Sequence, residues 1–229
     1  LWDKPSDRGT LSGGSWQAGL PLVNLHGQDV QRVARSTSAS TAHTRFRVDL
    51  GTARPALLSM FALLNHTITA AGQWRIVATS DASDADPGAR GLDTGLMDVW
   101  VPTAMFGAQP WGVLPWDGID ETAYPSGTVA FPLLPAPVVA RYLWVYIEDA
   151  ANPAGFVQAG RFLAGQAWSP QVNASYGASI RWVDPGEARR TRGGRRVVKT
   201  APRYRQFEMQ FEALSEAEAM GIAFEVSRQ

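Results

Sequence analysis

Cysteine is absent from this chain of 229 residues. Its absence excludes disulfides, zinc–thiolate sites and thiol nucleophiles, so stability has to come from core packing or from association with partners. No apolar run reaches the roughly 20 residues that a membrane-spanning helix needs. The first residues, which include Asp3, Lys4 and Asp7, also lack the apolar stretch of a signal peptide. The sequence therefore predicts a soluble chain with no membrane span and no leader.

Histidine is scarce as well, with three residues, and this limits nucleophilic catalysis. A serine or threonine nucleophile needs a nearby base such as histidine or lysine, and none of the histidines lies in a recognisable catalytic motif. We interpret His66, at the end of an apolar run, as a structural histidine. Asp49, before Leu-Gly, is typical of a turn residue that accepts backbone hydrogen bonds. We predict no catalytic residues and no cofactor, although two carboxylates from distant strands would make a glycan-cleaving enzyme a third possibility.

Charge is balanced overall but not along the chain. The formal net charge is zero, yet the residues up to Gly165 include 11 basic and 14 acidic side chains, and those after it include 10 and 7. A hydrophobic content of 45% and an aromatic content of 10% are those of a globular protein with a sizeable core. The change near Gly165 indicates two parts of different composition.

Apolar residues recur with strand periodicity in the first part. In "RFRVDL" (45–50) and "QWRIVATS" (73–80) they alternate with polar residues, as in half-buried strands. The uniformly apolar "ALLSMFALL" (56–64) indicates a buried strand. "RYLWVYIEDA" (141–150) is apolar on both faces, which predicts a strand covered on both sides. After the turn "NPAG", the stretch "GFVQAGRFLAG" (155–165) predicts one more strand.

The second part predicts a small α+β domain. "SIRWVD" and "YRQFEMQFEAL" have strand patterns, and "PGEARRTRGGRRVVK" predicts a basic hairpin that turns at Gly193 and Gly194. Ser215 and Glu218 form a capping-box pattern ahead of apolar residues at helical spacing. We expect antiparallel strands, the basic hairpin and one C-terminal helix that packs on the sheet.

The expected organisation has three parts. Residues 1–20 are rich in glycine and predict an N-terminal arm. Residues 21–165 form the mainly β domain, and residues 166–229 form the α+β domain, which we expect to dock the chain onto neighbours.

The order of these patterns resembles a known family. A strand that ends in "FRVDLG", an apolar strand closed by "NH", a strand "WRI", and "RYLWVYIED" followed by "NPAGFVQAGRFLAG" are similar to the elements of discoidin-like, galactose-binding-like jelly rolls. The resemblance covers roughly residues 20 to 165. It implies a two-sheet β-sandwich.

The combination of the two parts resembles a second group. A discoidin-like sandwich followed by a basic Gly-Gly hairpin, "FEMQFEALSEAEA" and a helix is similar to tail-tip and baseplate proteins of long-tailed bacteriophages. This resemblance implies a structural component of the virion tail, made in the host cytoplasm. Fold by itself does not fix function.

A segment dense in proline, glycine and tryptophan, residues 99–118, is the sharpest candidate for ligand binding. Sugar sites need flat aromatic faces beside polar groups, and such faces are offered by three tryptophans of this segment, Trp100, Trp111 and Trp116. The alternative is that these rings pack over an open end of the sandwich or against a neighbouring subunit. Both alternatives make this segment an interaction surface.

The basic hairpin is the second candidate surface. It has six cations, Arg189, Arg190, Arg192, Arg195, Arg196 and Lys199. Nucleic-acid binding is not expected, because the hairpin lacks interleaved aromatic residues and the whole chain is neutral. We expect these cations to pair with carboxylates of an adjacent subunit.

A metal site is not expected. Asp81, Asp84 and Asp86 crowd oxygen ligands as a calcium loop would, but Gly95 stands where the closing bidentate glutamate of such a loop belongs. Aspartate, serine and glycine in succession are also ordinary turn chemistry.

The sequence thus predicts a non-enzymatic structural protein of a phage tail tip or baseplate. Its partners would be other tail proteins in an oligomeric assembly, with no nucleic acid and no membrane span. The alternative function is that of a carbohydrate-binding module that recognises a host cell-surface glycan.

Overall fold

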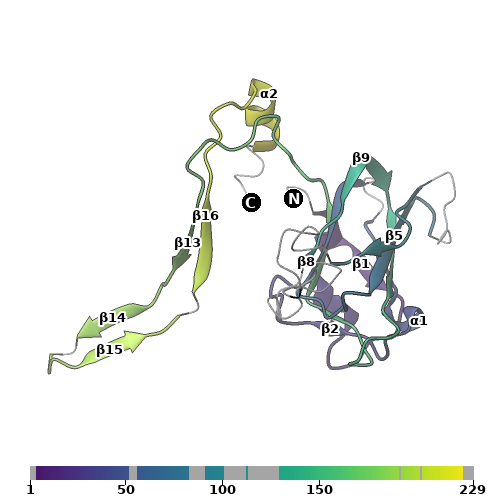
Figure 1. The fold of residues 1–229 in the computed structure, drawn as a ribbon, viewed down its shortest axis with the longest axis horizontal. Coiled ribbons are helices and arrows are strands. Elements are labelled where there is room, and N and C mark those ends of the chain that lie inside the picture. The colour runs from purple at the N-terminus through teal and green to yellow at the C-terminus, as the bar shows by residue number, and fades with distance from the viewer. Residues whose placement is uncertain are drawn as a thin grey trace. The chain divides into compact units, whose positions relative to one another are not determined.

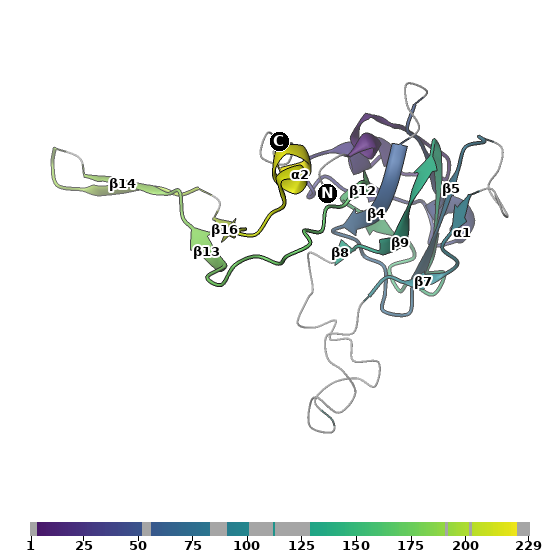
Figure 2. The same ribbon diagram turned by 90° about the horizontal axis from the view of Figure 1, so that it is seen from above.

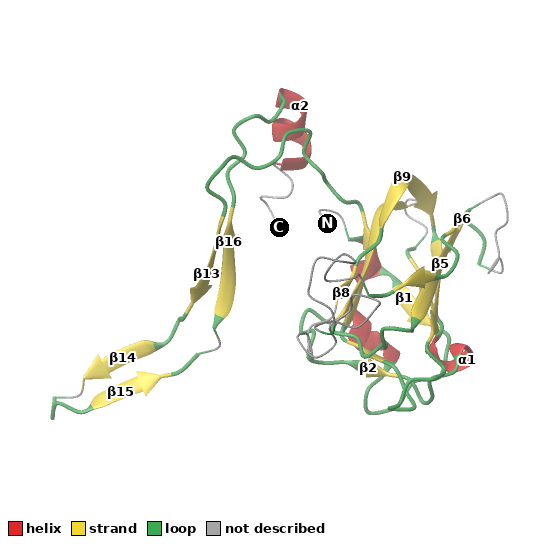
Figure 3. Cartoon of the chain, viewed as in Figure 1, coloured by secondary structure: helices red, strands yellow, loops and turns green. Residues whose placement is uncertain are grey.

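The computed structural model describes residues 4–51, 56–82, 91–100, 112, 129–190, 192–201 and 203–223. The chain divides into two compact units, Leu1–Ala167 and Trp168–Gln229 (Figure 1). Most of the ordered elements are strands, and every strand pair is antiparallel (Figure 3). The prediction of a mainly β sandwich followed by a small α+β unit is confirmed. None of the helices in the described part has the length and apolar character of a membrane span.

The larger sheet of the first unit has six strands in the order β1-β3-β10-β5-β6, with β7 also paired to β5. Their bounds are β1 Thr10–Ser12, β3 Phe46–Asp49, β5 Gln73–Thr79, β6 Leu92–Asp93, β7 Met97–Asp98 and β10 Tyr142–Glu148. The strand β10 lies between β3 and β5, although it follows them by more than 60 residues. The sheet therefore closes only when a late part of the chain inserts between two early ones.

The second sheet has the order β12-β4-β8, with β9 also paired to β4 (Figure 2). Its strands are β4 Ala56–Leu64, β8 Val129–Ala130, β9 Leu133–Ala140 and β12 Arg161–Gly165. A short ladder joins β2 Ala34–Arg35 to β11 Gln158–Ala159. The described part of the unit also contains the short helical turns η1 Pro5–Arg8, η2 Leu22–His26 and α1 Thr41–Thr44.

The two sheets enclose one hydrophobic core. Phe46 of the first sheet meets Phe162 of the second edge to face, with ring centroids 5.3 Å apart. The largest fully buried side chain is that of Trp74, and Leu143 and Leu58 are also inaccessible to solvent. Aromatic pairs of this geometry stabilise a core beyond the area that they bury.

The strand β10 was expected to be covered on both sides, and its two faces are covered by different chemistry. Leu143, Val145 and Ile147 are fully buried in the core. On the opposite face, Tyr142 and Trp144 lie under the guanidinium of Arg47, whose Cζ is 5.6 and 5.4 Å from the two ring centroids. The cation of Arg47 therefore covers part of the outer aromatic face of β10.

The N-terminal segment differs from the arm that the sequence predicted. Thr10–Ser12 forms β1 at the edge of the six-stranded sheet. Ser6 is fully buried, and its Oγ accepts a hydrogen bond of 2.9 Å from the backbone N–H of Ala164. Asp7 pairs with Arg161, with Oδ2 2.8 Å from Nη2. The glycine content predicted a loose N-terminal arm. The segment is instead held by its pairing with the edge of the six-stranded sheet and by two polar contacts with β12.

The predicted final strand of the sandwich is broken at Gly160. Gly160 lies between β11 and β12 and donates its N–H to the carbonyl of Leu64 at 2.9 Å. A Cβ atom at this position would lie 2.1 Å from the carbonyl oxygen of Val30. Only glycine allows this close approach of two backbones, so the stretch crosses from one ladder to the next at this residue.

The second unit is a long two-stranded ribbon followed by a short helix. The pairs β13 Ser179–Val183 with β16 Tyr204–Glu208, and β14 Glu187–Arg190 with β15 Arg196–Lys199, follow one another along the ribbon. The helix α2 Glu216–Glu218 begins at a complete capping box between Ser215 and Glu218, as predicted, and continues as the π-helical turn η4 Ala219–Ala223. Strand β16 ends at Glu208, earlier than the sequence pattern suggested.

Candidate functional site

Three loops meet at one end of the sandwich. Residues 65–72 join β4 to β5, residues 149–157 join β10 to β11, and residues 99 and 100 follow β7. The loops contact one another through hydrogen bonds between Thr69 and Asp149, Asn152 and Thr67, and Trp100 and Ile68. Loops that a rigid sandwich holds together are common places for binding sites. We call this region the loop end.

Asp149 holds two of these loops. Its side chain is 5% exposed, and its Oδ2 accepts hydrogen bonds from the backbone N–H of Thr69 at 2.9 Å and from Nδ2 of Asn152 at 2.7 Å. Its Oδ1 accepts from Oγ1 of Thr69 at 2.7 Å. A buried carboxylate is tolerated only when such donors satisfy it. Asp149 therefore has a structural role, because both of its carboxylate oxygens accept hydrogen bonds within the protein.

The neighbouring residues fit this carboxylate closely. Asn152 donates from the same Nδ2 to the carbonyl of Thr67 at 2.9 Å and accepts at Oδ1 from the N–H of Ala154 at 3.0 Å. Gly155 then turns the chain with φ of 72°, as the "NPAG" pattern predicted. At Gly72, a Cβ atom would lie 3.0 Å from Cγ of Asp149. The loop end is thus preorganised by a network of short polar contacts.

Trp100 is anchored at the loop end. Its indole Nε1 donates to the carbonyl of Ile68 at 2.7 Å. Its ring lies edge on to the imidazole of His66, with centroids 6.1 Å apart, and packs against the hydrophobic core. Trp100 is half-buried, so part of the ring remains accessible. The first of the three predicted tryptophans therefore fixes the start of the tryptophan-rich segment.

The other predicted site residues are placed as follows. Trp111 and Trp116 lie outside the described residues. Arg189, Arg192, Arg195 and Lys199 are exposed on the ribbon, while Arg190 and Arg196 are backbone partners in the β14–β15 ladder, and the structure does not describe their side chains. The tryptophan segment and the basic hairpin belong to different units of the chain. Their roles remain predictions.

His66 is buried, which agrees with its interpretation as a structural histidine. The imidazole is 6% exposed, and burial lowers its pKa to about 4, an effect that the Asp149 carboxylate opposes. At neutral pH the ring is uncharged. A base with so low a pKa is a poor match for proton transfer near neutral pH.

Asp49 also has the structural role that the sequence indicated. Its Oδ1 accepts from the N–H of Gly51 at 2.9 Å, which forms the predicted turn. The structure adds a bidentate pair with Arg141, whose Nε and Nη2 lie 3.1 and 3.2 Å from the two carboxylate oxygens. The hydrogen bond from Arg141 lowers the pKa of Asp49 most, and the one from Gly51 adds to it.

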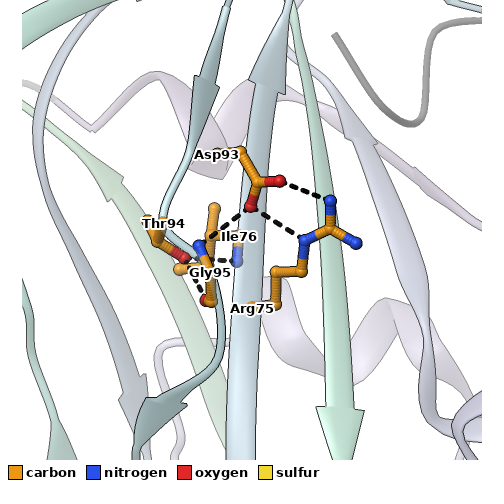
Figure 4. A network of polar contacts seen from close by, with 5 residues as sticks. All are labelled: Arg75, Ile76, Asp93, Thr94 and Gly95. Carbon is orange, nitrogen blue, oxygen red and sulfur yellow. Dashed lines mark hydrogen bonds and ion pairs between the residues drawn. The ribbon is translucent and has the colours of Figure 1, made fainter. Parts of the chain in front are cut away.

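A second polar network lies on the six-stranded sheet (Figure 4). Arg75 donates from Nε to Oδ1 of Asp93 at 2.8 Å and also pairs with Oδ2, which lowers the pKa of Asp93. Asp93 accepts from Gly95, and Thr94 accepts from the N–H of Ile76 at 2.9 Å. These bonds fasten β6 to β5. The sequence pattern did not predict this network, because its acids and bases lie 18 residues apart.

Several of the described carboxylates of the first unit are used within the protein. The carboxylates of Asp149, Asp49 and Asp93 are each occupied by hydrogen bonds within the protein. In the described part of the chain, no three acidic or histidine side chains gather where they could hold a metal ion.

Comparisons with solved structures find similarity to several carbohydrate-binding modules. No family model and no curated protein matches it. The chain is similar to CBM32-1 from a family 31 glycoside hydrolase of Clostridium perfringens, with 14% identity, a TM-score of 0.44 and coverage of 71% of this chain and 96% of that one. It is similar to the family 32 module of NanJ from the same organism, solved in complex with galactose, with 14% identity, a TM-score of 0.44 and coverage of 70% and 95%.

A chitosan-binding module from a chitosanase/glucanase of Paenibacillus sp. IK-5 is similar to the same extent. It has 13% identity and a TM-score of 0.44, and the match covers 72% of this chain and 99% of that module. Identities and TM-scores this low transfer no ligand or activity to this chain. The β-sandwich class rests on the strand pairing described above.

We expect Asp149→Asn to lower the free energy of unfolding of the first unit by about 2–3 kcal/mol. The asparagine amide replaces one acceptor oxygen with an NH₂ group, so the donors that were bonded to that oxygen lose their acceptor. Urea denaturation followed by tryptophan fluorescence measures the change. The matched control is Glu148→Gln on the adjacent exposed residue, which should leave the midpoint unchanged. Equal effects of the two substitutions would contradict the role given to Asp149.

We expect stability to fall as the pH decreases from about 6.5 to about 4. The pKa of His66 is about 4 in the folded state and 6.5 at its ordinary value, so the unfolded chain binds more protons in this window. The stability that comes from keeping His66 neutral is fully present above pH 6.5, and at most about 3 kcal/mol of it is lost as the pH falls through this window. Urea denaturation at several pH values should show a flatter dependence for His66→Gln. An unchanged slope in this variant would show that another group is responsible.

Proposed function

We propose that the sandwich is a non-enzymatic carbohydrate-binding module whose site is at the loop end. The anchoring of Trp100 carries this proposal: its N–H is bonded to Ile68, and its ring is held against His66 and the core. A rigid anchor fixes the start of a segment that contains Trp111 and Trp116. Flat aromatic faces on preorganised loops are what a pyranose ring requires.

The three tryptophans have different tasks in this proposal. Trp100 positions the segment, because its hydrogen bond is already made within the protein. Trp111 and Trp116 supply the faces that stack on the sugar. Thr67, which is exposed at the loop end, has a hydroxyl group that can then donate a hydrogen bond to a sugar hydroxyl.

We expect the whole chain to bind a subset of glycans on a glycan array and Trp111→Ala to lose that binding, because a stacking face is removed. The matched control is Trp182→Ala, which removes an exposed tryptophan from the second unit. Circular dichroism should show an unchanged fold in both variants. Absence of binding to every glycan, or equal loss in both variants, would refute the proposal.

A second candidate function is structural, as a component of a phage tail tip or baseplate located in the virion. The observation that favours it is the exposed apolar surface of the second unit, where Ile180 is 65%, Trp182 64% and Phe207 55% exposed. Large exposed apolar groups in a soluble chain are typical of protein interfaces. Such a protein can both build an assembly and adhere to a glycan.

We expect mass spectrometry of purified phage particles to detect this chain in a fixed ratio to the other tail proteins, because a structural subunit has a defined copy number. The control is the same measurement on tailless heads. Absence from complete particles would remove the structural interpretation and leave glycan binding untouched.

A further inference from the structure

The ribbon formed by β13 and β16 has two chemically different faces. In its antiparallel register, Ile180 is opposite Phe207 and Trp182 is opposite Arg205. Cross-strand partners point to the same side of a ladder, so these four side chains share one face. We call it the apolar face. The guanidinium of Arg205 lies 4.7 Å from the centroid of Trp182.

The opposite face of the same ribbon is polar at its centre. Arg181 and Gln206 are partners there, and the guanidinium of Arg181 donates from Nη2 to Oε1 of Gln206 at 3.1 Å. Val183 and Tyr204 complete this face toward the basic hairpin. The ribbon is thus amphipathic, with one face built like half of a protein core.

No described residue covers the apolar face, since its three apolar side chains are between 55% and 65% exposed. An isolated two-stranded ribbon is marginally stable in water and normally buries such a face. The chain therefore carries an unpartnered surface that a second molecule would stabilise.

Area and charge together select the kind of partner. Large apolar side chains offer roughly 150–250 Å² each, so the apolar face exposes on the order of 400 Å². This is about half of what one partner contributes to a standard interface, so a stable complex has to extend along the ribbon. Residues 179–208 contain nine basic and three acidic residues, a formal charge of +6. Two copies packed along their ribbons would therefore place arginine against arginine.

We propose that the apolar face, together with the adjoining basic hairpin, docks a different protein through an extended segment that alternates apolar and acidic residues. The apolar side chains of the segment cover Ile180, Trp182 and Phe207, and its carboxylates pair with the arginine forks of the ribbon. A strand-forming segment can also add to a free edge of the ribbon by backbone hydrogen bonds. The proposal goes beyond glycan binding, and it rests on the structural interpretation only in that both require a partner protein.

The test is a selection of random peptides of roughly ten residues, about the length of a strand, displayed on yeast and sorted with the whole fluorescent chain. We expect the enriched peptides to alternate apolar residues with Asp or Glu. Their binding should weaken at least about tenfold when Trp182→Ser and Phe207→Ser are combined. Tyr204→Ser is the matched control, because Tyr204 is 53% exposed on the other face of the same strand. It should bind as the unmodified chain does.

The charge requirement is tested with Arg192→Glu combined with Lys199→Glu, which should weaken the binding of the same peptides and reduce its salt dependence.

The proposal is overturned if the enriched peptides lack acidic residues or bind the Trp182/Phe207 variant equally well. It is also overturned if sedimentation velocity shows a dimer that Trp182→Ser dissociates, since the occupant is then a second copy. Binding of a single-stranded oligonucleotide that depends on Arg192 but not on Trp182 would identify a nucleic acid instead. None of these outcomes depends on the glycan array or on the presence of the chain in particles.

Discussion

A buried carboxylate that must be satisfied by donors from separate loops is the constraint on which the first unit depends. Asp149 takes hydrogen bonds from Thr69 and Asn152, and so joins the turn after β10 to the connection between β4 and β5. The first of these connections leaves the six-stranded sheet at β10, and the second enters the same sheet at β5 after crossing from β4 of the other sheet. Because an unsatisfied carboxylate would be costly at 5% exposure, these loops have little freedom to move apart, and Trp100 is fixed against the same structure.

The ribbon of the second unit, in contrast, exposes its apolar side chains instead of burying them. The described residues of this ribbon form no comparable core, and the side chains Ile180, Trp182 and Phe207 are largely exposed to solvent. The complete capping box at Ser215 and the pairing of Trp168 with Phe211, 5.7 Å between centroids, order the rest of the unit. The first unit is therefore stabilised from within, whereas the second has a surface that is suited to stabilisation by a partner.

Arginine has a different use in each unit. On the sandwich, Arg47, Arg75 and Arg141 lie over the outer aromatic residues of β10, where the rings of Tyr142, Trp144 and Tyr146 accept them. Two of these cations also pair with carboxylates at Asp93 and Asp49. Along the ribbon the cations outnumber the acids, so charge remains available for other molecules. The formal net charge of zero for the whole chain does not show this difference between the two units.

The sequence by itself determined strands β3, β4, β5 and β10 and those of the second unit, the turn at Asn152, the structural roles of Asp49 and His66, and the capping box. These features depend on alternation and on contacts between near neighbours. It did not determine that residues 4–12 join the sandwich, that Gly160 divides a strand, or that Asp149 binds Thr69 80 residues away. It also did not show that the apolar face of the ribbon is uncovered, since the alternation of Phe207 and Glu208 looks the same over a core or in solvent. Tertiary structure decided these points, because pairing and burial depend on which distant segments meet.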